Sequence, residues 1–154
     1  MACHDVITWV QELTEPFLKG IALKIEELNV EANNLKREVL IVKQGGEMYH
    51  ARNVHSIFKI TLRNCGVYCL DLAGAQFGYY SPVAPWFEYL VSRISSIKSC
   101  HPSGRGKANL LSREPDNSLP DFLTRVLDGC SRRTPIAMKE WESNHMTLST
   151  FNAY

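Results

Sequence analysis

Cys3, His55 and Asp71 are the residue types that together form a cysteine-nucleophile triad. Cys3 directly precedes an apolar periodic segment, so we expect it at a helix N-terminus, where the helix dipole and the unpaired N–H groups favour the thiolate. His55 opens one predicted strand and Asp71 closes the next. Residues opposite one another on paired strands have Cβ atoms about 5 Å apart, so Asp71 is expected to orient the imidazole. The pattern predicts nucleophilic catalysis with a cysteine, a histidine base and an orienting carboxylate.

The elements that must position these residues follow from the hydrophobic pattern. Helical spacing predicts a helix over 5–15, and Pro16 interrupts it before a further apolar helical segment that we expect to reach about residue 29. Residues 55–72 are expected to form a β-hairpin with its turn at 63–66. The other expected elements are a strand over 39–42, a loop over 73–85, and helices over 86–97, 119–127 and 135–146.

This element order predicts an α+β fold, with a small antiparallel sheet packed against an N-terminal helix and C-terminal helices. A chain of 154 residues, of which 45% are hydrophobic and 21% charged, has the size and composition of one globular domain. We therefore expect a single domain over 1–154, with a flexible polar connector over 101–117.

Two segments carry a resemblance to a known family: CHDVITWVQEL, and HSIFKITLRNCGVYCLDLAGAQFG. Their order of cysteine-bearing helix, histidine strand and aspartate strand resembles the papain-like/transglutaminase-like cysteine enzymes. The resemblance covers about residues 3–30 and 50–80. It implies a papain-like/transglutaminase-like core and acyl transfer through a thioester, with Cys3, His55 and Asp71 as nucleophile, base and orienter.

The resemblance also concerns the oxyanion hole. Papain-type enzymes place a glutamine several residues before the cysteine, a position that this sequence does not include. The oxyanion hole would then come from the Cys3 backbone N–H and a second donor such as Gln76 or Trp86.

The segment after Asp71 is expected to lie beside the site and to line a substrate cleft. The residues assigned to substrate binding are Gln76, Phe77, Tyr79, Tyr80 and Trp86. Ordinary core or loop packing is the alternative interpretation of the aromatic residues. No CxxC pair exists among the five cysteines, so we expect no zinc site, and catalysis by Cys3, His55 and Asp71 would need neither a metal nor an organic cofactor.

The leading functional hypothesis is an acyl-transfer enzyme (an amidase, hydrolase or acyltransferase) acting on a small-molecule or peptide substrate. Two alternatives stay open. One is a non-catalytic interaction module with a vestigial site, and the other is a non-covalent isomerase or cyclase that uses His55 and Asp71 in an aromatic pocket. The oligomeric state is left open.

Charge and hydropathy limit the expected partners. The net charge of +1, from 17 basic and 16 acidic residues, gives no basic footprint for nucleic acid. No run of about 18 apolar residues predicts a membrane span. An odd number of cysteines and an N-terminal segment without a secretory signal pattern predict reduced thiols and a cytoplasmic location.

Overall fold

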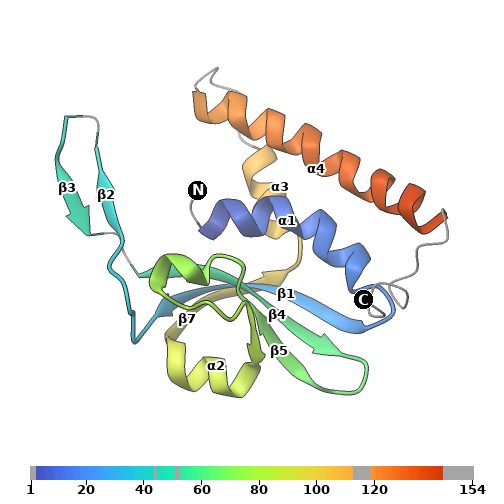
Figure 1. The fold of residues 1–154 in the computed structure, drawn as a ribbon, viewed down its shortest axis with the longest axis horizontal. Coiled ribbons are helices and arrows are strands. Elements are labelled where there is room, and N and C mark those ends of the chain that lie inside the picture. The colour runs from blue at the N-terminus through green and yellow to red at the C-terminus, as the bar shows by residue number, and fades with distance from the viewer. Residues whose placement is uncertain (1–2, 44, 51–52, 113–118, 144–154) are drawn as a thin grey trace.

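A five-stranded antiparallel sheet with the strand order β6-β5-β4-β1-β7 organises the fold (Figure 1). The computed structural model describes residues 3–43, 45–50, 53–112 and 119–143, without the side chains of residues 3–5, 119–121, 123, 141 and 142. The strands of this sheet are β1 (Ala22–Ala32), β4 (Val54–Leu62), β5 (Val67–Leu70), β6 (Val83–Pro85) and β7 (Ile94–Pro102). A separate two-stranded sheet consists of β2 (Leu40–Val42) and β3 (Met48–His50). The helices are α1 (Cys3–Phe17), the 3-10 helix η1 (Gly74–Phe77), α2 (Trp86–Arg93), α3 (Arg105–Leu111) and α4 (Leu119–Ser143).

Helices cover both faces of the sheet (Figure 1). Alternation along β4 directs His55 and Ile57 to one face and Phe58 and Ile60 to the other. The first face packs against α2, in a core that contains Ile57 and Tyr89. The second face packs against α1, where Ile7 contacts Phe58 and Ile60. Because β4 is buried on both faces, it is the rigid central strand that carries His55.

A buried lysine joins the three helices on the α1 side. The Lys107 ammonium on α3 donates to Glu12 of α1 and lies 2.9 Å from Asp128 Oδ1 and 2.8 Å from Ser131 Oγ, both on α4. A low-dielectric environment strengthens these charge-assisted bonds, and it makes each carboxylate depend on the shared cation. Lys107 therefore holds α1, α3 and α4 together in the layer on the α1 side of the sheet.

The predicted α+β class, the N-terminal helix and the 55–72 hairpin are confirmed, and the predicted strand over 39–42 corresponds to β2. The predicted continuation of the first helix to residue 29 is wrong, because β1 begins at Ala22. Gly20 adopts a φ of +84° just after α1, a conformation that glycine tolerates and other residues rarely adopt. The segment then pairs with β4 on one side and β7 on the other, and these pairings override its partial helical pattern.

The C-terminal half also differs from the predicted elements. The helix that begins at Trp86 ends at Arg93, and Ile94 enters an extended strand that pairs with β1. The expected connector is folded where it is described, because β7 reaches Pro102 and α3 follows. The two expected C-terminal helices are one helix, α4, with Pro135 inside it. None of the described helices is both long and apolar enough to cross a membrane.

Candidate active site

His55 and Asp71 meet at one end of the central sheet. His55 Nε2 lies 2.7 Å from Asp71 Oδ1, and the two residues are 0% and 3% exposed. The hairpin register pairs Phe58 with Leu70, so continued pairing would place Asp71 opposite Ile57. Asp71 therefore reaches His55 along the diagonal of one sheet face, one pair away from the directly opposite position that we expected.

Three donors hold the Asp71 carboxylate. Its Oδ1 accepts from His55 and from the Ala73 N–H at 3.2 Å, and its Oδ2 accepts from the Tyr89 hydroxyl at 2.6 Å. An ionised carboxylate can only accept, so Nε2 is the donor in its bond with His55. The neutral imidazole then carries its proton on Nε2 and presents an unprotonated Nδ1, which is the basic atom of the ring.

The helix η1 supplies the neighbours of Nδ1. Gln76 Nε2 lies 3.4 Å from His55 Nδ1, and the Phe77 ring meets the imidazole edge to face at a centroid distance of 4.8 Å. Gly74 lets η1 approach this closely, because a Cβ at that position would lie 2.4 Å from Asp71 Oδ2. The sequence segment Gly74–Phe77 is thus part of the site wall.

Burial around Asp71 keeps two neighbouring groups protonated. The pKa of Tyr89 is raised, first by burial and then by the Asp71 charge, so its hydroxyl remains a donor. Burial, followed by the same charge, also raises the pKa of the Cys69 thiol, which suits a neutral core residue. The Arg93 guanidinium stacks over Tyr79 and Tyr89, at 4.5 and 5.0 Å from their centroids, and places a cation near this carboxylate.

The predicted substrate-binding residues divide into three groups. Gln76 and Phe77 contact His55 directly. Tyr79 is buried and donates its hydroxyl to the Asn33 carbonyl. The other two take part in cation–π contacts: Tyr80 is exposed beside Arg37, and Trp86 packs against the α2-side core beneath Lys59.

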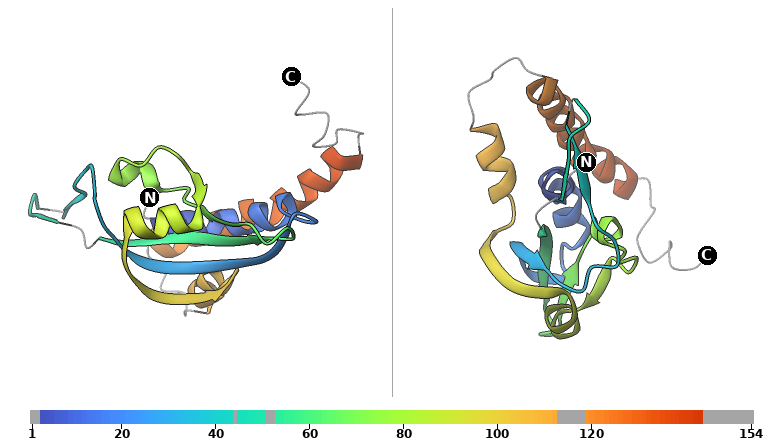
Figure 2. Two further views of the ribbon diagram at one scale, coloured as in Figure 1. Left: turned by 90° about the horizontal axis from the view of Figure 1, so that it is seen from below. Right: turned by 90° about the vertical axis from the view of Figure 1, so that its left-hand side faces the viewer.

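Cys3 begins α1, as predicted, and its side chain lies outside the described residues. The first turn of α1 and η1 lie at the same end of the sheet (Figures 1 and 2). Both elements therefore share one end of the sheet with His55, but α1 packs on the face opposite to the one that carries His55 and Asp71.

Two residues of the site were absent from the sequence prediction: Tyr89 and Gly74. Tyr89 shares one face of α2 with Trp86, Leu90 and Arg93, which follow the i, i+3, i+4, i+7 spacing of a buried helical stripe. That spacing could have marked Tyr89 as an inward-facing residue. No sequence signal distinguishes Gly74 from an ordinary loop glycine.

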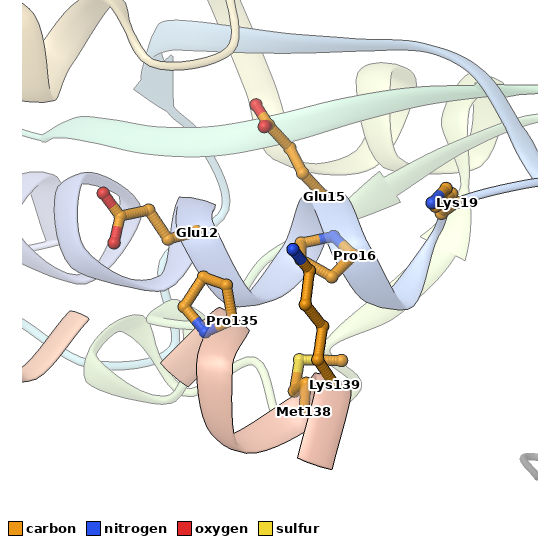
Figure 3. Close-up of a pocket in the computed structure, with 7 residues that line it drawn as sticks. All are labelled: Glu12, Glu15, Pro16, Lys19, Pro135, Met138 and Lys139. Carbon is orange, nitrogen blue, oxygen red and sulfur yellow. The ribbon is translucent and has the colours of Figure 1, made fainter. Parts of the chain in front are cut away.

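Two of the hollows in the described structure differ in which elements line them. One, of about 600 Å³, is at the His55 end of the sheet and is lined in part by Ala32, Asn33 and Asn53. The other, of about 360 Å³, lies between α1 and α4; Glu12, Glu15, Pro16, Lys19, Pro135, Met138 and Lys139 line it (Figure 3). Only the first adjoins the strand end that bears His55. Among the described residues, no three His, Cys, Asp or Glu side chains are grouped to hold a metal ion.

Comparison of the chain with family models, with curated proteins and with solved structures finds no match in any of the three. Function must therefore be argued from the geometry of the site.

Proposed function

We propose that the chain is a cysteine-nucleophile acyl-transfer enzyme with a papain-like/transglutaminase-like core, in which Cys3 attacks, His55 moves the proton and Asp71 orients His55. The observation that carries the proposal is the 2.7 Å bond from His55 Nε2 to Asp71 Oδ1, which leaves Nδ1 as the base. The first turn of α1 lies at the same end of the sheet on the face opposite to His55, so the proposed attack requires the Cys3 sulfur to reach Nδ1 past the end of β4.

The proposed reaction has two half-reactions. His55 Nδ1 takes the Cys3 thiol proton, the sulfur attacks the acyl carbon, and collapse of the tetrahedral intermediate breaks the bond to the leaving group, which receives that proton. Water or an amine then attacks the thioester, losing a proton to Nδ1, and the Cys3 thiol is regenerated. Asp71 stabilises the transient imidazolium through the Nε2 bond.

Gln76 is the proposed side-chain donor of the oxyanion hole. Its amide nitrogen lies 3.4 Å from His55 Nδ1, so a carbonyl poised between nucleophile and base would lie within its reach. The Cys3 backbone N–H at the helix start is the proposed second donor. Each such donor contributes about 3–4 kcal/mol to lowering the barrier.

Alkylation with iodoacetamide across a pH range, followed by peptide mapping, tests the proposal. We expect Cys3 to react faster than the exposed Cys65 and Cys130, with a midpoint well below the ordinary thiol value of about 8.5. His55→Gln should remove this advantage without changing the labelling of the other two thiols. Equal rates for Cys3 and Cys65 in the wild-type chain would refute the proposal.

A second candidate, the non-catalytic module, is favoured by one observation: the His55 side chain is completely buried. In that case the bonds that join Tyr89, Asp71, His55 and Gln76 stabilise the fold alone. His55→Gln would then lower the unfolding free energy while the alkylation rate of Cys3 stayed that of the wild type. The same alkylation series therefore separates the two candidates.

A further inference from the structure

The two-stranded sheet β2–β3 stands away from the rest of the domain as an arm (Figures 1 and 2). We use the term arm for β2 and β3 together. All six of its strand residues are exposed. Five of them are large and apolar: Leu40, Ile41, Val42, Met48 and Tyr49, with exposed fractions of 40–67%. An exposed apolar surface of this kind marks an interaction site more often than it marks solvent-facing structure.

The arm also offers unpaired backbone. In the described part of the chain, β2 and β3 pair with each other and with no other strand. Three residue pairs form the whole ladder. A two-stranded hairpin of this size is only marginally stable in water, and its outer edges can accept an added strand. An extended polypeptide is the ligand that satisfies such an edge, through main-chain hydrogen bonds.

The base of the arm leads to the candidate active site. The hollow of about 600 Å³ is lined by Leu35, Glu38, Val39 and His50 at this base, and by Ala32, Asn33, Asn34 and Asn53 at the end of the sheet. The Ala32 N–H donates to the Asn53 carbonyl at 2.7 Å, and Asn53 precedes His55 by two residues. On the other side, the Lys36 N–H donates to the carbonyl of Phe77 in η1 at 3.0 Å. The chain segments that line the hollow are therefore hydrogen-bonded to η1 on one side and lead into the His55 end of β4 on the other.

The chemistry of this hollow also suits a polypeptide. Three asparagines line it. Asn33 Oδ1 accepts from the Asn34 N–H and Asn34 Nδ2 donates to the Ser92 carbonyl, and the other carboxamide atoms are donors and acceptors of the kind that a peptide group pairs with. Lys36 and Arg37 are exposed between the hollow and η1, where a Cβ on Gly78 would lie 2.7 Å from Lys36 Cβ. The one carboxylate in the lining, Glu38, lies 3.5 Å from His50 Nδ1, so the two flanking cations outnumber it and favour acidic residues in the bound segment.

We infer that the arm and the hollow bind an extended, β-branched and acidic segment of a polypeptide, which is the acyl-group substrate of the His55 site. This inference rests on the proposed function for its substrate role. The docking surface itself rests on the arm, its open edges and the hollow.

The test uses a fluorescein-labelled peptide of about twelve residues, which spans about 40 Å when extended. It is rich in Val, Ile, Thr and Tyr and carries two Glu at one end. A control peptide of equal length has Pro at alternate positions, which removes the N–H donors. Val42→Glu with Met48→Lys replaces two of the five exposed apolar side chains while a cross-strand ion pair keeps the arm paired, because these residues are opposite one another. Phe87→Glu, at a 74% exposed position on α2, is the matched surface control.

We expect the wild-type chain and Phe87→Glu to bind the first peptide equally, and the double variant to bind it at least about tenfold more weakly. The bound peptide should also slow alkylation of Cys3 in the wild type and not in the double variant. Equal affinity for the proline peptide, or undiminished binding by the double variant, would overturn the inference. A dimer of the free chain that the double variant dissociates would overturn it too, because a second copy would then occupy the arm.

The two proposals fail separately. Arm-dependent binding that leaves Cys3 alkylation unprotected would refute the substrate role. A chain that has an activated Cys3 but does not bind the peptide would refute the docking surface and leave the acyl-transfer proposal intact. Cys3→Ala should bind the peptide as the wild type does, because the thiol takes no part in docking.

Discussion

Gly74→Ala should disrupt the candidate active site without changing any of its polar groups. The new Cβ would lie 2.4 Å from Asp71 Oδ2 and 2.8 Å from its Cγ, whereas ordinary contact begins at 3.4 Å. The carboxylate must therefore retreat by about 1 Å. If the tyrosine stays in place, its bond to Oδ2 lengthens from 2.6 Å to about 3.6 Å, where no hydrogen bond remains.

The size of the effect follows from the bond that is lost. A hydrogen bond to a charged group contributes about 1.5–3 kcal/mol to stability. For a chain of this length, each kcal/mol lowers the melting temperature by about 2–4 °C, so we expect a fall of about 3–12 °C. Displacement of Asp71 also frees the His55 ring, so the alkylation advantage of Cys3 should decline in the same variant.

Gly129→Ala is the matched control, because a Cβ there meets no atom within 4 Å and the residue lies inside α4. It should leave stability unchanged or raise it by up to about 1 kcal/mol. Thermal unfolding followed by circular dichroism, together with Cys3 alkylation, provides both measurements. A Gly74→Ala chain as stable as Gly129→Ala, with wild-type alkylation, would refute the steric argument.

Three further predictions concern the groups around the site and the helical layer. Tyr89→Phe removes the donor to Asp71 Oδ2 and should cost about 1.5–3 kcal/mol in urea unfolding, an effect that an unchanged midpoint would contradict. Because folding raises the pKa of Tyr89 and Cys69, their contribution to stability is complete at neutral pH and declines above about 10 for the phenol and 8.5 for the thiol. Unfolding free energies measured from pH 7 to 11 should therefore fall less steeply in Tyr89→Phe and Cys69→Ala than in the wild type. Lys107→Met should destabilise the chain by about 3 kcal/mol, since it removes the buried cation shared by Glu12 and Asp128 and leaves Asp128 with its exposed partner Arg132, and a loss below about 1 kcal/mol would argue against that role.

The local sequence pattern was sufficient to predict the hairpin that carries His55 and Asp71. Alternation in HSIFKITL and VYCL, with a turn between them, fixes which residues share a sheet face. His55 and Asp71 belong to one face for that reason, and the hairpin register then sets their contact along the diagonal of that face, one pair away from the directly opposite position that we expected. The neighbours Gln76 and Phe77 follow Asp71 closely along the chain, so the short connection by itself brings them near the imidazole.

The local sequence pattern was insufficient where helical spacing and strand alternation occur in the same segment. The segment after Gly20 has apolar residues at helical spacing (Ile21, Ile25, Leu28), and it also alternates over Leu28, Val30 and Ala32. Strand pairing on both of its edges decides in favour of β1, because each ladder satisfies backbone groups that an isolated segment would leave to water. The same pairing ends the second helix at Arg93 and draws Ile94 into the sheet.

By itself the sequence determined the α+β class, an N-terminal helix beside Cys3, and a hairpin that brings His55 and Asp71 onto one sheet face. Only the tertiary structure decided that Tyr89, 18 residues beyond Asp71, donates to its second oxygen. It also decided that Gly74 must lack a side chain and that the arm opens toward the His55 end of the sheet. The physical reason is that contacts within a hairpin depend on the alternation pattern of a short, continuous segment. The contacts of Tyr89, Gly74 and the arm depend instead on how a helix, a turn and a separate sheet pack around that hairpin.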